Sequence, residues 1–146
     1  YEGIAWTTGA AVMAGGQMPD KRSLLLALLY SVGTHGIMTL NDFKAVQGDR
    51  QMGVRSLPVQ LGVQSAAGVA CWFMGLPQVV VIILLFAWGC PAQALAVAAL
   101  LGIQLLMMDY FLTRVVQRAL WYSGFGVPFF VAGMMVSAFA LRGLIS

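Results

Sequence analysis

Long apolar runs alternate with short polar clusters along the chain. Glycine, proline and charged residues bound the runs, as is typical of connections between helices. A run of about 20 apolar residues lets a helix cross the hydrocarbon of a bilayer, and a shorter run is ambiguous between a transmembrane and a buried helix. The alternation with polar connections favours transmembrane helices. Five apolar segments are predicted, at residues 4–14, 24–40, 65–89, 92–116 and 128–141.

The residues between these segments predict the connections. Residues 15–22 are expected to form a loop, followed by Ser23 as the N-cap of the second helix. Pro77 lies near the middle of the third segment and is expected to kink it. The short 89–91 connection predicts an antiparallel return, and residues 117–126 are expected to form an amphipathic link at the membrane interface.

Composition supports the same class of fold. Hydrophobic residues make up 60% of the 146 residues and charged residues only 9%, and the mean hydropathy is +0.86. Soluble domains contain about 25% charged residues, and a soluble fold of this length cannot cover so much apolar surface. Lipid solvates apolar faces, so the chain is predicted to form an all-α, multi-pass transmembrane bundle.

Two classes of site are disfavoured by the same composition. The net charge of +3 is dispersed rather than gathered into a basic stripe, which argues against nucleic acid as a partner. Cys71 and Cys90 show no metal-ligand or disulfide spacing. They are expected to be buried small hydrophobes.

The charged residues also predict an orientation. If successive spans alternate in direction, the polar stretch at residues 41–56 lies on the side with more basic residues, which the positive-inside rule places in the cytoplasm. That side carries five bases and the other three: Lys44, Arg50, Arg55, Arg114 and Arg118 against Lys21, Arg22 and Arg142.

Residues 41–56 hold the groups that are best suited to chemistry. If the preceding helix continues through them, Asp42 and Asp49 lie two turns apart on one face. Carboxylates on one face can hold Mg²⁺, which prefers oxygen ligands and shares its coordination with water and substrate phosphate. The alternative is a solvated loop whose charges only set the topology. Three bases in this stretch could neutralise phosphate oxygens: Lys44, Arg50 and Arg55.

The string NDFKAVQGDR at residues 41–50, followed by GVRSLPVQLG at residues 53–62, resembles the second aspartate-rich motif of the UbiA family of intramembrane prenyltransferases. Within this family it is most similar to chlorophyll and bacteriochlorophyll synthases. A weaker resemblance continues at residues 108–112 and 127–134, so the similarity covers essentially the whole chain. Many relatives carry a second aspartate where this chain has Ala45, and the acid shifted to Asp42 favours the chlorophyll branch.

The resemblance implies a bundle of nine spans, of which residues 1–146 would be the C-terminal half and hold the last five. It implies a Mg²⁺-dependent transfer of a geranylgeranyl or phytyl group from its diphosphate to the propionate of bacteriochlorophyllide a, in a bacterial photosynthetic inner membrane. Asp42 and Asp49 would bind metal and act in catalysis together with Arg55, while Lys44, Arg50 and Arg55 would bind the diphosphate. The first aspartate-rich motif would lie outside the chain, which alone would be inactive.

Two other functions stay open. One is a related transferase that prenylates an aromatic quinone precursor or haem. The other is a non-catalytic membrane protein of pigment assembly, in which the polar stretch sets the topology.

Three further polar residues are candidates for the second shell or the acceptor pocket. His35 precedes Asp42 by seven residues and would share its face, where it could contact the magnesium of the chlorophyllide or only make a hydrogen bond between packed helices. Asn41 begins the motif. Asp109 is expected to pair with a base of the motif, Arg55 or Lys44, or with Arg114 as a structural contact.

Overall fold

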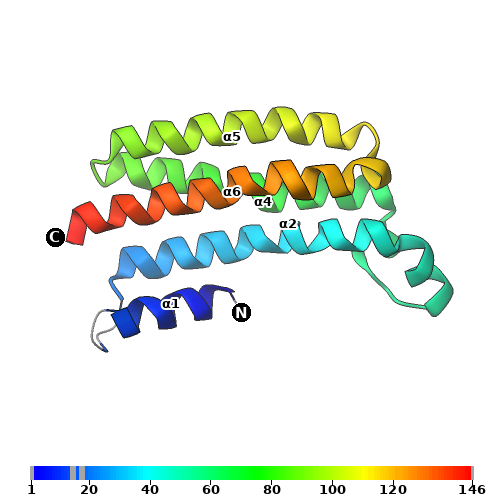
Figure 1. Ribbon diagram of the computed structural model, residues 1–146, viewed down its shortest axis with the longest axis horizontal. Coiled ribbons are helices and arrows are strands. Elements are labelled where there is room, and N and C mark those ends of the chain that lie inside the picture. The colour runs from blue at the N-terminus through cyan, green and yellow to red at the C-terminus, as the bar shows by residue number, and fades with distance from the viewer. Residues whose placement is uncertain (1, 14–15, 17–18, 146) are drawn as a thin grey trace.

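Helices account for nearly all the residues that the computed structural model describes, which are 2–13, 16 and 19–145 (Figure 1). Four of them, α2, α4, α5 and α6, are long and apolar enough to cross a membrane. The predicted all-α membrane fold is thereby confirmed. The first predicted segment corresponds to α1, whose 12 described residues span only about 18 Å at 1.5 Å per residue. The helices are α1 (Glu2–Met13), α2 (Lys21–Met52), α3 (Leu57–Leu61), α4 (Val63–Ala87), α5 (Pro91–Leu112) and α6 (Val115–Ile145).

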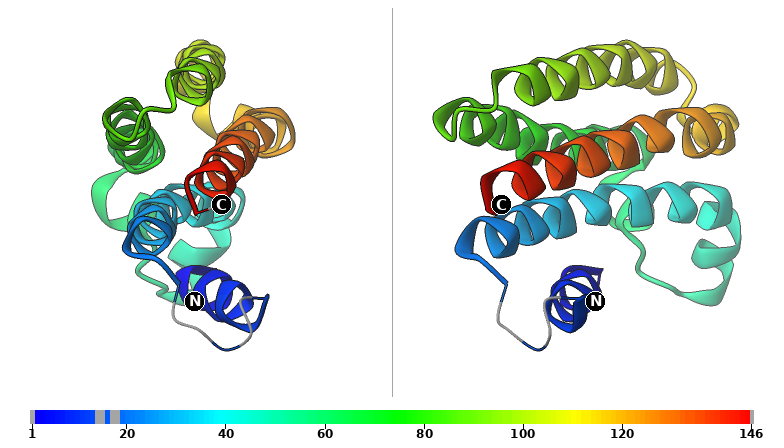
Figure 2. Two further views of the ribbon diagram at one scale, coloured as in Figure 1. Left: turned by 90° about the vertical axis from the view of Figure 1, so that its left-hand side faces the viewer. Right: turned by 60° about the vertical axis from the view of Figure 1, so that its left-hand side comes forward.

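The four long helices form a bundle in which chain neighbours run in opposite directions (Figure 1). Viewed along the bundle, α2, α4, α5 and α6 stand at the corners of a four-sided arrangement, and α1 lies outside it against α2 (Figure 2, left). In this arrangement α2 packs against α4 and α6, whereas α5 makes no contact with α2. The site residues on α2 are therefore neighbours of α4, not of α5.

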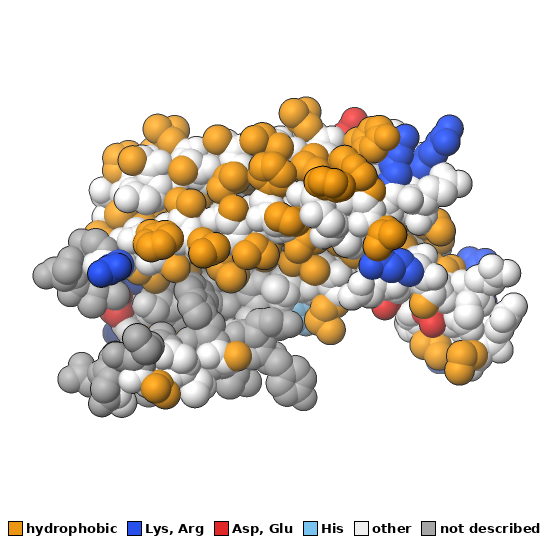
Figure 3. Space-filling view, viewed as in Figure 1, with side chains coloured by type: hydrophobic (Ala, Val, Ile, Leu, Met, Phe, Trp, Pro, Cys, Tyr) orange, Lys and Arg blue, Asp and Glu red, His pale blue; other side chains and the backbone are white. Residues whose placement is uncertain are grey.

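Charge and apolar surface are separated along the bundle. Hydrophobic side chains cover most of the visible long face, and basic side chains gather at its two ends (Figure 3). The C-terminus of α2 and the α5–α6 connection lie at the same end (Figure 1). This end carries the larger predicted group of bases, and the start of α2 and the end of α6 carry the smaller one.

α2 begins earlier and ends later than the sequence suggested. Its N-cap is Asp20, whose carboxylate accepts a hydrogen bond from the Arg22 backbone nitrogen at 3.3 Å. The prediction of Ser23 as the cap was wrong, because a carboxylate already serves the first turn three residues earlier. Of the loop predicted at residues 15–22, residues 15, 17 and 18 lie outside those described.

The polar residues 41–52 belong to α2 and do not form a loop. None of them is proline, and their charged and amide side chains are compatible with a helix. The helix ends only at Gly53, which has a φ of 69° and donates its backbone N–H to the Asp49 carbonyl oxygen. A left-handed glycine is a common helix terminator because it lacks a Cβ.

The link predicted at residues 117–126 is also helical and forms the first part of α6. Tyr122, expected at the membrane interface, is instead fully buried within the bundle. The short connection between α5 and α6 turns at Thr113 and Arg114, so no separate link is needed. Pro77 and Pro128 lie inside α4 and α6 without ending either helix.

Two glycines allow α2 to approach its neighbours closely. A Cβ at Gly36 would overlap the Ala70 carbonyl oxygen of α4, and a Cβ at Gly33 would overlap the Phe130 ring of α6. Pro77 has no N–H to donate to the Phe73 carbonyl oxygen, and this carbonyl faces Gly33. Small residues at such crossings are typical of membrane bundles, where tight packing takes the place of hydrophobic burial.

Buried polar side chains link all four spans. Gln78 of α4 donates to the side-chain oxygen of Gln104 of α5 at 2.8 Å, and the Gln104 amide donates to the Tyr122 hydroxyl of α6 at 3.1 Å. A second bond joins the Tyr30 hydroxyl of α2 to the Ser137 hydroxyl of α6 at 2.9 Å. These side chains are almost wholly inaccessible, so we define them as the inter-helix network.

Gly36→Ala is expected to destabilise the bundle by about 1–3 kcal/mol, the usual cost of overpacking. The added methyl group meets the Ala70 backbone carbonyl, which cannot rotate away as a side chain can. Unfolding of the full-length protein in detergent measures the change. Gly102→Ala in α5 is the matched control, since nothing lies within 4 Å of its Cβ. Equal stability of the two variants would contradict the close contact.

Gln104→Leu is expected to lower the free energy of unfolding by about 1 kcal/mol, in the range measured for hydrogen bonds between membrane helices. It removes the acceptor of Gln78 and the donor to Tyr122. The exposed Gln117 of α6 provides the control substitution Gln117→Leu, which should cost nothing measurable. If Gln117→Leu lowered the free energy of unfolding as much as Gln104→Leu does, the result would argue against the inter-helix network.

Candidate functional site

α2 carries most of the predicted site residues because it continues past the membrane. Its 32 residues span about 48 Å, whereas the hydrocarbon of a bilayer is about 30 Å thick. The apolar residues 23–40 are enough to cross it. Residues 41–52 therefore extend the helix by about three turns into the polar region at 3.6 residues per turn.

His35, Asp42 and Asp49 follow one another at intervals of seven residues on α2. Seven residues correspond to almost two full turns, so the three side chains share one face and are spaced about 10 Å apart along the axis. We call these three residues the α2 stripe. The prediction depended on the helix continuing through the polar stretch, and the structure meets this condition.

A pocket of about 510 Å³ opens on the same face. It combines residues of α2 with one residue each of α3 and α4, so it exists only where these helices meet. Three of the predicted residues, His35, Asn41 and Asp42, lie in its wall. Asp49 continues the α2 stripe beyond the residues that line the pocket. The lining residues are His35, Met38, Thr39, Asn41, Asp42, Leu57 and Phe73.

The turn after α2 leads into α3, whose first residue lines the pocket. The backbone N–H groups of Gly53 and Val54 both donate to the Asp49 carbonyl oxygen, which closes the helix and reverses the chain. Arg55 follows, and its carbonyl oxygen accepts a hydrogen bond from the Gln60 side chain of α3. Leu57 at the start of α3 is thereby held against the pocket.

The three predicted phosphate-binding bases are exposed and lie outside the pocket lining. Lys44 follows Asp42 by two residues, or about 200° around the helix, so it leaves from nearly the opposite face. Its amine donates to the Asn41 side-chain oxygen at 3.3 Å. Arg50 adjoins Asp49 on α2, and Arg55 lies in the turn. The bases surround the acidic end of α2 rather than line the pocket.

The carboxylates of the α2 stripe have no cationic partner in the part of the chain that the structure describes. Among the residues that the structure describes, neither Asp42 nor Asp49 forms an ion pair, and no group of three or more histidine, cysteine or acidic side chains is assembled. Asp42 is partly buried at the polar end of α2. Burial raises the pKa of its carboxyl above the ordinary value, and the negative charge of Asp49 raises it further. A divalent cation would offset both effects.

The spacing decides how these carboxylates can hold a cation. Two aspartates about 10 Å apart along a helix axis cannot both bind directly to one Mg²⁺, whose oxygen ligands lie at about 2.1 Å. Each can hold its own ion, or both can share one through water. Mg²⁺ usually keeps several waters and completes its shell with substrate phosphate. The donor set fits a hydrated cation that bridges protein and diphosphate.

His35 lies on the pocket wall in a defined orientation. Its Nδ1 is 3.0 Å from the Ser31 carbonyl oxygen of the preceding turn. The imidazole stacks on the Phe73 ring of α4, with centroids 6.4 Å apart and an interplanar angle of 29°. The stacking on Phe73 confirms neither role predicted for His35, contact with the magnesium of the acceptor or a hydrogen bond to another helix, because Phe73 is an aromatic ring and makes no hydrogen bond.

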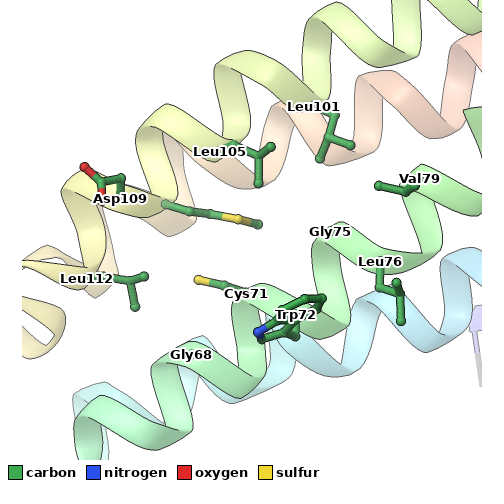
Figure 4. Close-up of a pocket in the computed structure, with 11 residues that line it drawn as sticks. Gly68, Cys71, Trp72, Gly75, Leu76, Val79, Leu101, Leu105, Asp109 and Leu112 are labelled. Atoms are coloured by element: carbon green, nitrogen blue, oxygen red, sulfur yellow. The ribbon is translucent and has the colours of Figure 1, made fainter.

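Asp109 belongs to a different pocket, of about 370 Å³, between α4 and α5 (Figure 4). Its walls are mostly apolar, and the Cys71 side chain points into it. Within the described part of the chain Asp109 forms no ion pair, so none of its predicted partners contacts it. α5 does not touch α2, which keeps this acid away from the α2 stripe.

Four pocket residues were missed by the sequence analysis: Met38, Thr39, Leu57 and Phe73. Phe73 and Leu57 come from α4 and α3, and nothing in their local sequence indicates that they face α2. Met38 and Thr39 could have been found, because they lie within one turn of His35 and Asp42 on the same helix.

The chain is similar to proteins of known families. The sequence profile of the UbiA prenyltransferase family matches residues 3–132. A bacteriochlorophyll synthase 33 kDa chain of Cereibacter sphaeroides is 54% identical over 99% of this chain and 47% of that protein. A bacteriochlorophyll synthase 34 kDa chain of Chloroflexus aurantiacus is 42% identical over 97% of this chain and 44% of that protein.

The sequence is also similar to plant proteins. A chloroplastic chlorophyll synthase of Arabidopsis thaliana is 38% identical over 96% of this chain and 36% of that protein. The chain spans about half the length of the bacterial relatives it matches. No solved structure matches it significantly.

Asp49→Asn is expected to lower the pKa of Asp42, because it removes the negative charge that opposes ionisation of Asp42. The pKa should stay above the ordinary value, since burial is the larger cause and is unchanged. Infrared or NMR titration of ¹³C-labelled aspartate in the full-length protein, without divalent cations, measures the shift. Asp20→Asn, at the other end of α2, should leave it unchanged. An unaltered Asp42 pKa in Asp49→Asn would show that the two carboxylates are independent.

Proposed function

Because the chain belongs to the UbiA prenyltransferase family, we propose that the full-length protein transfers a polyprenyl group to the propionate of a bacteriochlorophyllide. The donor is geranylgeranyl or phytyl diphosphate. The observation that carries this proposal is the α2 stripe, in which Asp42 lines a pocket and neither carboxylate forms an ion pair with a described residue. The names of the bacterial and plant relatives support a chlorophyll-type acceptor.

The reaction first separates charge, when the allylic diphosphate ionises, and then neutralises the allylic cation with the propionate. The bond between the allylic carbon and the diphosphate oxygen breaks, and diphosphate leaves with the electron pair. An oxygen of the ionised propionate then forms a bond to the allylic carbon, which gives the ester. No proton has to be moved, because the propionate reacts as a carboxylate at neutral pH. The costly step is the departure of diphosphate, which needs concentrated positive charge.

Asp42 and Asp49 position that charge at the polar end of α2. When bound, Mg²⁺ neutralises the diphosphate oxygens and makes diphosphate a better leaving group. Arg50 and Arg55 are exposed beside the α2 stripe and can reach the same phosphates with charge-assisted hydrogen bonds. Lys44 acts differently, since its amine holds the Asn41 side chain at the pocket wall.

The pocket places the allylic group at the boundary between polar and apolar surroundings. Asp42 and Asn41 lie at its polar side, and Phe73 and Leu57 supply apolar walls. An allylic cation is captured by water wherever water has access, so apolar walls protect it. The long chain of the donor is soluble in the bilayer and can stay there during the reaction.

The remaining features of the protein follow from the same proposal. This chain would be the C-terminal half of one nine-span domain, whose other half supplies the first aspartate-rich motif. The end of the bundle with the larger group of bases would face the cytoplasm, in keeping with the positive-inside rule. The protein would lie in the photosynthetic inner membrane of a bacterium.

Asp42→Asn and Asp49→Asn are each expected to lower kcat by at least about 100-fold, the usual loss when a group that stabilises transition-state charge is removed. The assay supplies the full-length protein with chlorophyllide, geranylgeranyl diphosphate and Mg²⁺ and measures the ester. Asp20→Asn is the matched control because it changes an aspartate at the opposite end of α2, and it should retain activity.

Acceptor competition separates the alternatives. Transfer to an aromatic quinone precursor or haem, but not to chlorophyllide, would overturn the proposed acceptor. Full esterification by Asp49→Asn would overturn the metal role and favour a topological role for the polar end of α2. Absence of transfer to any of these acceptors by the wild-type protein would favour a non-catalytic function in pigment assembly.

A further inference from the structure

The hydrogen bond of His35 defines which of its ring nitrogens is available to a ligand. The Ser31 carbonyl oxygen can only accept, so Nδ1 must carry the proton that it donates over 3.0 Å. In the neutral imidazole, Nε2 then has a free lone pair. Histidines that bind metals almost always donate their other ring N–H to a carbonyl or carboxylate, which fixes the tautomer and the ring orientation. His35 has this arrangement.

The surroundings of His35 leave room for a large ligand. The residue is exposed and belongs to the wall of the 510 Å³ pocket. Phe73 stacks on the imidazole and limits its rotation, so the ring keeps one orientation. No other described residue forms a hydrogen bond with Nε2. The free lone pair is therefore held in a fixed orientation at an accessible pocket.

The polarity of the α2 stripe matches that of a tetrapyrrole acid. His35 lies in the apolar part of α2, and Asp42 lies about 10 Å further along the axis in the polar part. A chlorophyllide has the same division, because its macrocycle is apolar and its propionate is charged. With the macrocycle at the level of His35, the propionate points toward the carboxylates of the α2 stripe.

We propose that Nε2 of His35 binds the central magnesium of the tetrapyrrole acceptor as its axial ligand. This inference rests on the proposed function and names the part of the site that recognises the acceptor. The macrocycle leaves the axial positions of its magnesium open to a nitrogen donor. Axial ligation fixes the distance of the propionate from the diphosphate site, so His35 selects metal-containing acceptors and positions them without touching the reacting atoms.

The experiment compares chlorophyllide with its magnesium-free form, pheophorbide, as ligands of the full-length protein in nanodiscs without donor diphosphate. Wild-type protein is expected to bind chlorophyllide at least about tenfold more tightly than pheophorbide, a difference of about 1.4 kcal/mol. His35→Leu should bind both equally. Absorption and resonance Raman bands of chlorophyllide report the coordination number of its magnesium. These bands should change when chlorophyllide binds to wild-type protein and should not change when it binds to His35→Leu. In His35→Gly, added imidazole should restore the bands.

Control variants make the outcomes distinct. Asp49→Asn should still bind chlorophyllide more tightly than pheophorbide although it loses turnover. Arg142→Ala should keep both this binding preference and turnover. An unchanged preference and unchanged bands in His35→Leu would overturn axial ligation. If His35→Leu raised only the KM for the diphosphate donor, this result would also overturn axial ligation and would assign His35 to donor binding. If wild-type protein neither binds nor esterifies chlorophyllide, the proposed function itself fails, which is a separate result.

Discussion

The close approach of α2 to α4 is the contact on which the site depends. Gly36 lies directly against the Ala70 carbonyl oxygen, and Gly33 lies against the carbonyl that Pro77 leaves without its helical hydrogen bond. A larger residue at Gly36 would separate α2 from α4, and a larger residue at Gly33 would meet the Phe130 ring of α6. Their separation sets the stacking of His35 on Phe73 and the width of the pocket between them. A packing requirement inside the membrane therefore controls the geometry at its surface.

A bilayer provides little hydrophobic force to hold helices together, so membrane bundles rely on shape and polar contacts. The inter-helix network supplies the polar contacts here. Gln78 and Gln104 connect α4 to α5 and reach Tyr122 of α6, while Tyr30 fixes α2 to α6 through Ser137. The polar end of α2 remains outside this network. Among the described residues its carboxylates form no ion pair, which leaves them available to a ligand.

The motif and its face could be predicted from the sequence, but the role of each base could not. Asp42, Asp49 and His35 share one helix, so a spacing of seven residues was sufficient to align them. A diphosphate-binding role of Lys44 stays a prediction, and the helix directs its side chain to nearly the opposite face from Asp42 and toward Asn41. Asp109 was expected to pair with Arg55, Lys44 or Arg114, but it forms no ion pair with a described residue, and α5 does not contact α2.

The sequence by itself determined that the chain is an all-helical membrane protein with an aspartate-containing motif, because composition and local spacing are properties of the chain alone. The helix boundaries were harder to predict. The polar stretch after Leu40 resembles a loop in composition. α2 nevertheless continues to Gly53, because the stretch contains no proline and the helix tolerates Gly48. Only the tertiary structure decided which residues form the pocket. Phe73 and Leu57 come from two other helices, and no local pattern specifies how those helices meet α2.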